Sequence, residues 1–243
     1  MQQYYNCGVT KGKNYIEGTS IYHWYTQLCL CSCHPRKGIP QKTYRLNNRV
    51  KKSFHRIRMT KSVQQDLNTW QNFLRNFNGK SLILSDRWLT SDQLHLFTDA
   101  SGTLGYGALF GAQWFLGKWD TKWQKQNIAF LELYPIVLAV EIWGHQIKNQ
   151  CIYFHTDNIA LVSVINKQTS KDALIMFLIR RLVLHCLRNN VNFKAKHIYG
   201  SKNVLADALS RQQVQKFHRL APWADTVPKS VPNLPDLPSY RNP

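Results

Sequence analysis

The stretch LHLFTDASGTLGYGALFGAQWFLGKW, Leu94–Trp119, predicts three consecutive β-strands. Apolar and polar residues alternate at its start, which is the period of a half-buried strand, and Gly102, Gly105 and Gly107 supply the turn positions of a hairpin meander. One carboxylate, Asp99, stands at the end of the first strand, where its side chain can point into a cleft and bind a metal ion. Taken alone, such an aspartate is more often a turn residue, so its role depends on the rest of the chain.

The composition of the 243-residue chain is that of a folded and strongly basic protein. A hydrophobic content of 44%, with 8 Trp, 11 Tyr and 11 Phe, predicts a core. The net charge of +19 favours a polyanionic partner, either nucleic acid or an anionic membrane surface. No apolar run reaches the roughly 18 residues of a membrane span, and the N-terminus lacks the layout of a signal peptide. We therefore expect an intracellular protein, in cytoplasm or nucleus, that binds nucleic acid and no membrane.

The six cysteines do not predict a disulfide or metal framework. CLCSCH, Cys29–His34, lacks CxxC spacing and a distant partner pair, so a zinc site there is a weak hypothesis. Cys151 and Cys186 stand in apolar segments, where a reduced and buried thiol is expected.

Three segments flank the predicted central domain of residues 93–211. Residues 1–58 carry 11 Lys and Arg against the single Glu17, which predicts a disordered basic arm that adds salt-dependent phosphate affinity. In residues 59–92, apolar residues at three- and four-residue steps predict an amphipathic helix over Met59–Phe77, followed by a strand over Phe77–Leu84. Residues 212–243 hold six of the nine prolines and are predicted to be an irregular tail or linker.

After the three strands, the central domain alternates between helical and strand patterns. Pro135 is expected near the start of the first helix, which would place Glu132 at its N-terminal end. The residues Thr169 to Asp172 resemble a capping box. The predicted elements are a helix over Ala129–His145, a strand over Cys151–Thr156, a short helix over Asn158–Asn166, a helix over Ala173–Asn189, a strand over Val191–Ile198, and a last helix over Val204–Arg211 capped by Asn203.

Acidic residues are scarce in this domain, and most of them lie at element boundaries. Between Leu94 and Arg211 there are seven acids against 13 basic residues. Four of the seven, Asp99, Glu132, Asp157 and Asp207, follow a strand or belong to the first or last helix. If they converge, they repel one another strongly unless cations hold them together, so the pattern predicts a divalent-metal site.

The segments FTDAS, LELYPIVLAVEIWG, TDNIALVSVINKQTSK and HIYGSKNVLADALSR resemble the RNase H domain of a retrotransposon reverse transcriptase. The ending H..G..N..AD.LSR is typical of gypsy-like elements, and FNGKSLIL ahead of the domain with QQVQKFHRLAPW behind it is similar to DIRS-type elements. The resemblance covers about half of the chain. It implies an α/β RNase H-like fold, in which a five-stranded mixed sheet (β-β-β-α-β-α-α-β-α) carries helices on both faces, and it likens residues 59–92 to the polymerase connection.

The resemblance also implies a metal-dependent endonuclease that cleaves the RNA strand of RNA/DNA hybrids with two Mg²⁺ ions, or with Mn²⁺. By family analogy Asp99 bridges both metals, Glu132 and Asp157 complete the leaving-group site, and Asp207 helps to hold the metal of the nucleophile. Ser101 and Asn158 could contact the 2′-OH or the backbone of the RNA, or could serve as ordinary turn and cap residues. The expected grip on the hybrid comes from basic side chains, namely Lys194, Lys196, Lys202, Arg180 and Arg181.

The chain departs from this family in three respects, one of which is that no basic protrusion lies between the helix ending near Lys167 and the one starting at Asp172. The loop before Asp207 shrinks to YGSKN and leaves His197 at a strand end, where a structural role is favoured over a catalytic one. No adjacent Asp-Asp pair exists, so we expect no polymerase activity and interpret the chain as a fragment without the polymerase palm, which could partner a polymerase part. Two alternatives remain, a non-catalytic nucleic-acid-binding remnant on the same scaffold and a DDE-type transposase or integrase core. The latter lacks an acid at the start of the first long helix, so Glu132 argues against it.

Overall fold

A computed structural model describes residues 15–17, 56–58, 60, 61, 64, 68, 87–124 and 126–232, and it divides the chain into two units, 1–81 and 82–243. In the first unit, β1 (Tyr15–Glu17) pairs antiparallel with β2 (Arg56–Arg58), so the basic arm is not irregular throughout. The described residues of the predicted Met59–Phe77 helix, Lys61, Gln64 and Asn68, are helical. The predicted strand over Phe77–Leu84 and the CLCSCH segment lie outside the described residues.

The predicted meander is present as an antiparallel sheet of β4 (Leu96–Ala100), β5 (Gly105–Phe110) and β6 (Gln113–Lys118). Its first strand begins two residues later than Leu94, because the preceding residues form a short helix, α4 (Ser91–Leu94). A capping box between Thr90 and Gln93 starts this helix, and His95, in the left-handed conformation at φ 49°, ends it.

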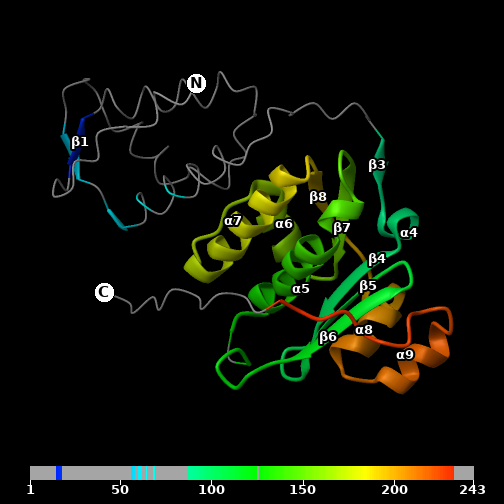
Figure 1. Cartoon of the computed structure of the whole chain (residues 1–243). Helices are drawn as coiled ribbons and strands as arrows, with labels where there is room; N and C mark the ends of the chain where they lie inside the picture. The colour runs from blue at the N-terminus through cyan, green and yellow to red at the C-terminus, as the bar shows by residue number, and fades with distance from the viewer. Residues whose placement is uncertain are drawn as a thin grey trace. The chain divides into compact units, whose positions relative to one another are not determined.

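The second sheet is parallel and contains β3 (Trp88–Leu89), β7 (Cys151–Thr156) and β8 (Asn192–His197), with β7 in the centre. The mixed α/β class is therefore confirmed, whereas one continuous five-stranded sheet is not observed. Strands β4 and β7 lie side by side (Figure 1), but among the described residues no backbone ladder joins them. The unpredicted strand β3 pairs with the start of β7, and α4 then separates β3 from β4.

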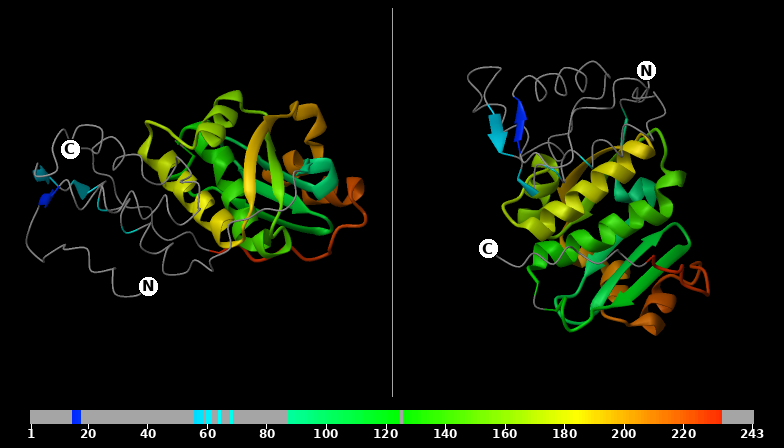
Figure 2. Two further views of the ribbon diagram at one scale, coloured as in Figure 1. Left: turned by 90° about the horizontal axis from the view of Figure 1, so that it is seen from above. Right: turned by 60° about the vertical axis from the view of Figure 1, so that its left-hand side comes forward.

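After α4, the described helices of this unit are α5 (Ile128–Trp143), η2 (Gly144–Gln146), α6 (Ile159–Lys167), α7 (Ala173–Arg188), η3 (Gly200–Lys202), α8 (Val204–Ser210) and α9 (Val214–Leu220). Helix α5 covers one face of the β4–β6 sheet and packs on α7, while α8 and α9 lie on the other face (Figure 2). By length and composition the helical segment Ile128–Gln146 could cross a membrane. However, 67% of its most apolar part is buried inside the domain, as in the core helix of many proteins.

Polar side chains cap α5 and α7, and the cap of α7 differs from the prediction. Asn127 accepts a hydrogen bond from the Ala129 N–H at 2.9 Å, which places Glu132 in the second turn of α5. Pro135 lies inside α5, deeper than the helix start to which we assigned it. Asp172 caps α7 alone by accepting from the N–H groups of Leu174 and Ile175, so the predicted capping box from Thr169 is wrong.

The prediction of an irregular tail over residues 212–243 is wrong for α9 (Val214–Leu220), whereas the described residues after it, 221–232, contain no helix or strand. Helix α9 buries Phe217 completely against Trp114, with a ring separation of 5.2 Å. The chain then returns along β6, where the Trp114 indole donates to the Asp225 carbonyl at 2.5 Å and the Lys229 N–H donates to the Trp114 carbonyl at 2.8 Å. The apolar spacing of Val214, Phe217 and Ala221 explains the helix, and the folded domain therefore extends beyond residue 211.

Candidate active site

Asp99 occupies the fourth position of β4 and is held by both ends of α8. The Ser210 hydroxyl, on a fully buried side chain, donates to Asp99 Oδ2 at 2.6 Å. The Asn203 amide donates to Asp99 Oδ1 at 3.3 Å and to the Thr98 carbonyl at 3.0 Å. Asn203 therefore stands at the N-cap position of α8 without capping it by its side chain, contrary to our prediction. Its amide joins α8 to β4 instead.

A glycine on the neighbouring strand allows α8 to come this close. Gly107 is the register partner of Asp99, and a Cβ atom added to Gly107 would lie 2.4 Å from the Leu209 Cβ. Real Cβ atoms do not approach so closely, so any larger residue would push α8 away from the sheet. The glycine that we assigned to a turn therefore sets the distance between Ser210 and Asp99.

Glu132 lies in the second turn of α5 and faces the carboxyl end of β7. The Thr156 hydroxyl donates to Glu132 Oε2 at 2.5 Å. Asp157 follows directly in sequence and forms a side-chain hydrogen bond with Glu132.

The pKa values show that the predicted carboxylates act on one another. Burial raises the pKa of Asp99 from 3.8 to about 6, against the lowering effect of the Ser210 hydrogen bond, and the charges of Asp157 and Asp207 raise it further. Burial also raises the pKa of Glu132 from 4.5 to about 7; the Thr156 hydrogen bond opposes this rise, and the charges of Asp157 and Asp99 add to it. The four side chains therefore form one electrostatic group at the carboxyl ends of β4 and β7, which we call the carboxylate cluster.

Asp207 occupies the outer side of the carboxylate cluster. Its carboxylate accepts a hydrogen bond from the Arg211 guanidinium at 2.6 Å, one helical turn further along. Asp157 is bordered by the η3 turn, where a Cβ atom at Gly200 would lie 3.5 Å from Asp157 Oδ2. The structure thus brings Asp99, Glu132, Asp157 and Asp207 to one edge of the domain.

The cluster offers only carboxylate oxygens, which are the ligands that Mg²⁺ and Mn²⁺ prefer in proteins. In the described parts of the chain, however, no three His, Cys, Asp or Glu side chains are grouped so that they could hold a metal ion. Protein groups bind three of the carboxylates, namely Ser210 on Asp99, Thr156 on Glu132 and Arg211 on Asp207. The donor chemistry fits a divalent cation, and a cation would have to compete with these partners.

Ser101 and Asn158 both have local structural roles. The Ser101 hydroxyl accepts from the N–H groups of Thr103 and Leu104 at 3.4 and 3.3 Å, which is the pattern of a side-chain turn. The Asn158 side chain accepts from the Leu161 N–H at 3.0 Å and caps α6. A contact of either residue with RNA stays a prediction.

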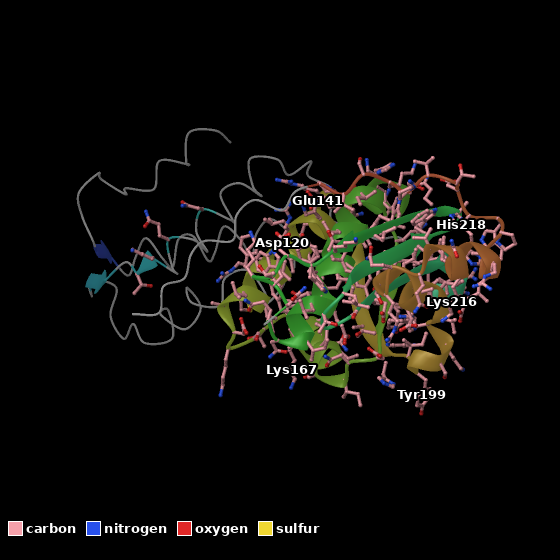
Figure 3. All side chains as sticks on the ribbon, turned by 90° about the horizontal axis from the view of Figure 1, so that it is seen from below. Asp120, Glu141, Lys167, Tyr199, Lys216 and His218 are labelled. Atoms are coloured by element: carbon pink, nitrogen blue, oxygen red, sulfur yellow. The ribbon has the colours of Figure 1, made fainter. Side chains whose placement is uncertain are left out.

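Arg181 belongs to the contact between α5 and α7. Its guanidinium donates to both carboxylate oxygens of Glu141, at 2.6 and 2.7 Å, and its side chain is only 18% exposed. In Figure 3 Glu141 lies in the upper part of the view and Tyr199, which follows β8, at its lower edge. The half-buried Arg180 is its neighbour on α7. Arg181 therefore joins α5 to α7, and the geometry does not support its predicted contact with the hybrid.

The predicted lysines differ from the arginines because all three are exposed. Lys202 lies on η3 beside the carboxylate cluster, and Lys194 and Lys196 lie on β8. His197 is exposed at the end of β8 and contacts the Tyr199 ring edge-on at 5.3 Å, with no contact to the carboxylates. Cys151 and Cys186 are buried free thiols, as predicted.

Sequence reasoning missed the partners of the carboxylates. Asn203 and Ser210 stand four residues before and three residues after Asp207, a spacing that places all three on neighbouring positions of one helix. This spacing could have predicted that Ser210 lies near the carboxylates. Nothing in the sequence marked Thr156 as a partner except its position before Asp157.

Compared with known proteins, the chain matches no protein-family model and no curated protein.

Proposed function

We propose that this domain is a metal-dependent endonuclease that cleaves the RNA strand of RNA/DNA hybrids, as in the RNase H part of a retroelement polyprotein. The observation that carries the proposal is the carboxylate cluster, in which Asp99 and Glu132 have raised pKa values. Like charges that lie close together and are partly buried destabilise a fold unless a cation neutralises them, so a chain with 32 basic and 13 acidic residues has little structural reason to gather four acids. A divalent-metal site gives such a reason.

In this function the four carboxylates would hold the metal, and the remaining groups would position them. Divalent ions, when bound, supply an activated water and stabilise the leaving 3′ oxygen. Ser210 and Asn203 fix both oxygens of Asp99, so that its orientation is set before substrate arrives. Thr156 does the same for Glu132. Lys202, exposed on η3, is placed to neutralise a phosphate near this edge.

The same proposal includes an intracellular site of action and a polymerase part as partner, since RNA/DNA hybrids arise during reverse transcription. Both statements rest on the resemblance of the sequence to retroelement RNase H domains, together with the basic charge of the chain.

A second candidate function is non-catalytic binding of nucleic acid on the same scaffold. The observation that favours it is that Ser210, Thr156 and Arg211 already satisfy three of the four carboxylates. In a binder, these bonds would be permanent structural links between β4, α5 and α8.

The test is a release assay with the full chain on an end-labelled RNA/DNA hybrid, in Mg²⁺ and in EDTA. Single-stranded RNA, duplex RNA and duplex DNA of the same sequence serve as substrate controls. The proposal predicts Mg²⁺-dependent cleavage of the RNA strand in the hybrid alone. Hybrid binding without any Mg²⁺- or Mn²⁺-dependent cleavage would select the second candidate, and cleavage of single-stranded RNA in EDTA would indicate a contaminating nuclease.

A further inference from the structure

Within the described residues 87–232, one face of the β3–β7–β8 sheet carries aromatic rings and lysines instead of a covering helix. The register pairs Tyr153 with Lys194 and His155 with Lys196, so these four side chains point to the same side of the sheet. Trp88, paired with Cys151, extends this side onto β3. The alternate residues are buried and form the opposite side, namely Ile152, Phe154, Phe193 and Ala195.

On this side the lysines and rings are in direct contact. Lys194 Nζ lies 4.6 Å from the centre of the Trp88 ring, and Lys196 Nζ lies 3.8 Å from the centre of the Tyr153 ring. The two rings contact each other at 4.8 Å with an interplanar angle of 35°. We call Trp88, Tyr153, Lys194 and Lys196 the cation–aromatic face. Cation–π attraction thus holds both ammonium groups over the rings in the free protein.

The surroundings leave this face positively charged. His155 is fixed at its edge by a hydrogen bond with Ser91 at 2.6 Å, and Asp92 on α4 is an acid whose charge reaches His155. Lys194 and Lys196 are both exposed, so the two ammonium groups exceed that one carboxylate. An anionic occupant is therefore favoured over a neutral or basic one.

The face also leads toward the carboxylate cluster. Strand β7 ends at Thr156, whose side chain points to the opposite, buried side and binds Glu132, and Asp157 follows directly. From Tyr153 to Asp157 an extended chain rises about 13 Å, which is within the reach of a few nucleotides. Lysines that contact phosphates, with aromatic rings available for stacking, are typical of surfaces that bind single-stranded nucleic acid.

We propose that the cation–aromatic face binds a single-stranded extension of the hybrid whose paired part lies at the carboxylate cluster. The inference rests on the proposed function for the hybrid but concerns a separate surface. Lys194 and Lys196 contact successive phosphates of the extension, and Trp88 and Tyr153 stack on its bases when the lysines shift toward phosphate.

The experiment compares the affinity of the full chain, in EDTA, for a blunt hybrid and for the same hybrid with a single-stranded DNA tail of about ten nucleotides. Fluorescence anisotropy at several salt concentrations gives the dissociation constants. The wild type is expected to bind the tailed hybrid about tenfold more tightly. In Lys194→Ala/Lys196→Ala this gain should disappear and the salt slope for the tailed hybrid should fall by about 1.4, because each phosphate contact on a single strand contributes about 0.7.

Two further variants separate charge from stacking. Lys118→Ala/Lys148→Ala removes two exposed lysines from other surfaces and should leave the tail-dependent gain intact. Trp88→Leu should weaken binding of the tailed hybrid about tenfold while leaving its salt slope unchanged. Thermal midpoints of all variants show whether they fold.

Three results would overturn the proposal: no gain from the tail in the wild type, equal losses for blunt and tailed hybrids in the lysine variant, or equal competition by a polyglutamate peptide, which would indicate an acidic protein partner.

Cleavage of the blunt hybrid is measured in parallel. A wild type that cleaves blunt hybrid but gains nothing from the tail disproves only the cation–aromatic face. A wild type that prefers the tail but never cleaves disproves only the proposed function.

Discussion

Replacing Asp99 by asparagine should stabilise the metal-free protein, because the ionised carboxylate destabilises the fold. The folded state raises the pKa of Asp99 from 3.8 to about 6. An acid with a raised pKa binds its proton more tightly when folded, so stability falls as pH rises between these two values and stays low above them. A shift of about 2.2 units corresponds to about 3 kcal/mol of lost stability near pH 7.5.

The asparagine removes this charge while its oxygen can still accept from Ser210. The asparagine side chain has a single oxygen, so it cannot accept from both Ser210 and Asn203. The Asn203 amide therefore loses a partner, at a cost of about 1 kcal/mol. The expected net gain is about 2 kcal/mol near pH 7.5, or about 4–8 °C in Tm for a domain of this size. Near pH 4.5 the carboxylate is mostly protonated in the fold, its destabilisation falls to about 1 kcal/mol, and the gain should vanish.

The assay is thermal unfolding followed by circular dichroism in EDTA, at about pH 4.5 and pH 7.5. Asp120→Asn is the matched control, because Asp120 is exposed in the loop after β6 and its carboxylate lies 4.0 Å from the Lys122 ammonium group. A lower Tm for Asp99→Asn than for the wild type at pH 7.5, or a shift equal to that of Asp120→Asn at both pH values, would refute this reasoning and return Asp99 to the role of a turn residue.

Three other outcomes follow from the same geometry. Millimolar Mg²⁺ or Mn²⁺ should raise the Tm of the wild type at pH 7.5 and have little effect on Asp99→Asn, because the cation relieves repulsion that the variant lacks; an unchanged wild-type midpoint would count against a metal site. Ser210→Ala should lower the cleavage rate about tenfold and shift the acid limb of its pH profile upward, since the Ser210 hydrogen bond lowers the pKa of Asp99; a lower rate with an unmoved profile would indicate damage to the fold alone. Ending the chain at Gln212 should lower Tm sharply by exposing Trp114, whereas ending it at Pro232 should not, as differential scanning fluorimetry can show; equal midpoints would disprove the packing of α9.

Local sequence patterns predicted most elements because each element carries its own period. The alternation in β4 and the continuous apolar surface of α5 depend on a few neighbouring residues, and both were found. The joining of strands depends on distant segments, and β3 and α4 were missed because they are only two and four residues long. In the tail, we gave the prolines more weight than the helical spacing of Val214, Phe217 and Ala221, which lies between them.

The candidate site shows the same division between local and tertiary information. The carboxylates were found because each stands next to a strand end or in a helix of recognisable pattern. Their partners were not found, because the bonds from Ser210 and Asn203 to Asp99 connect residues more than 100 positions apart. The ion pair of Arg181 with Glu141 was not predicted either, because nothing local shows that Arg181 faces Glu141 on another helix.

The most direct test of the central claim is the single-turnover rate of RNA cleavage in a saturating RNA/DNA hybrid with Mg²⁺, measured for the wild type, Asp99→Asn and Asp120→Asn purified in parallel. Asp99 lies within the carboxylate cluster, so Asp99→Asn should lose several orders of magnitude in rate, whereas Asp120→Asn should match the wild type. Hybrid affinity in EDTA should stay level or rise slightly in Asp99→Asn, because a negative charge near phosphate has been removed. Equal cleavage rates for the wild type and Asp99→Asn, in protein free of host RNase H, would contradict the account.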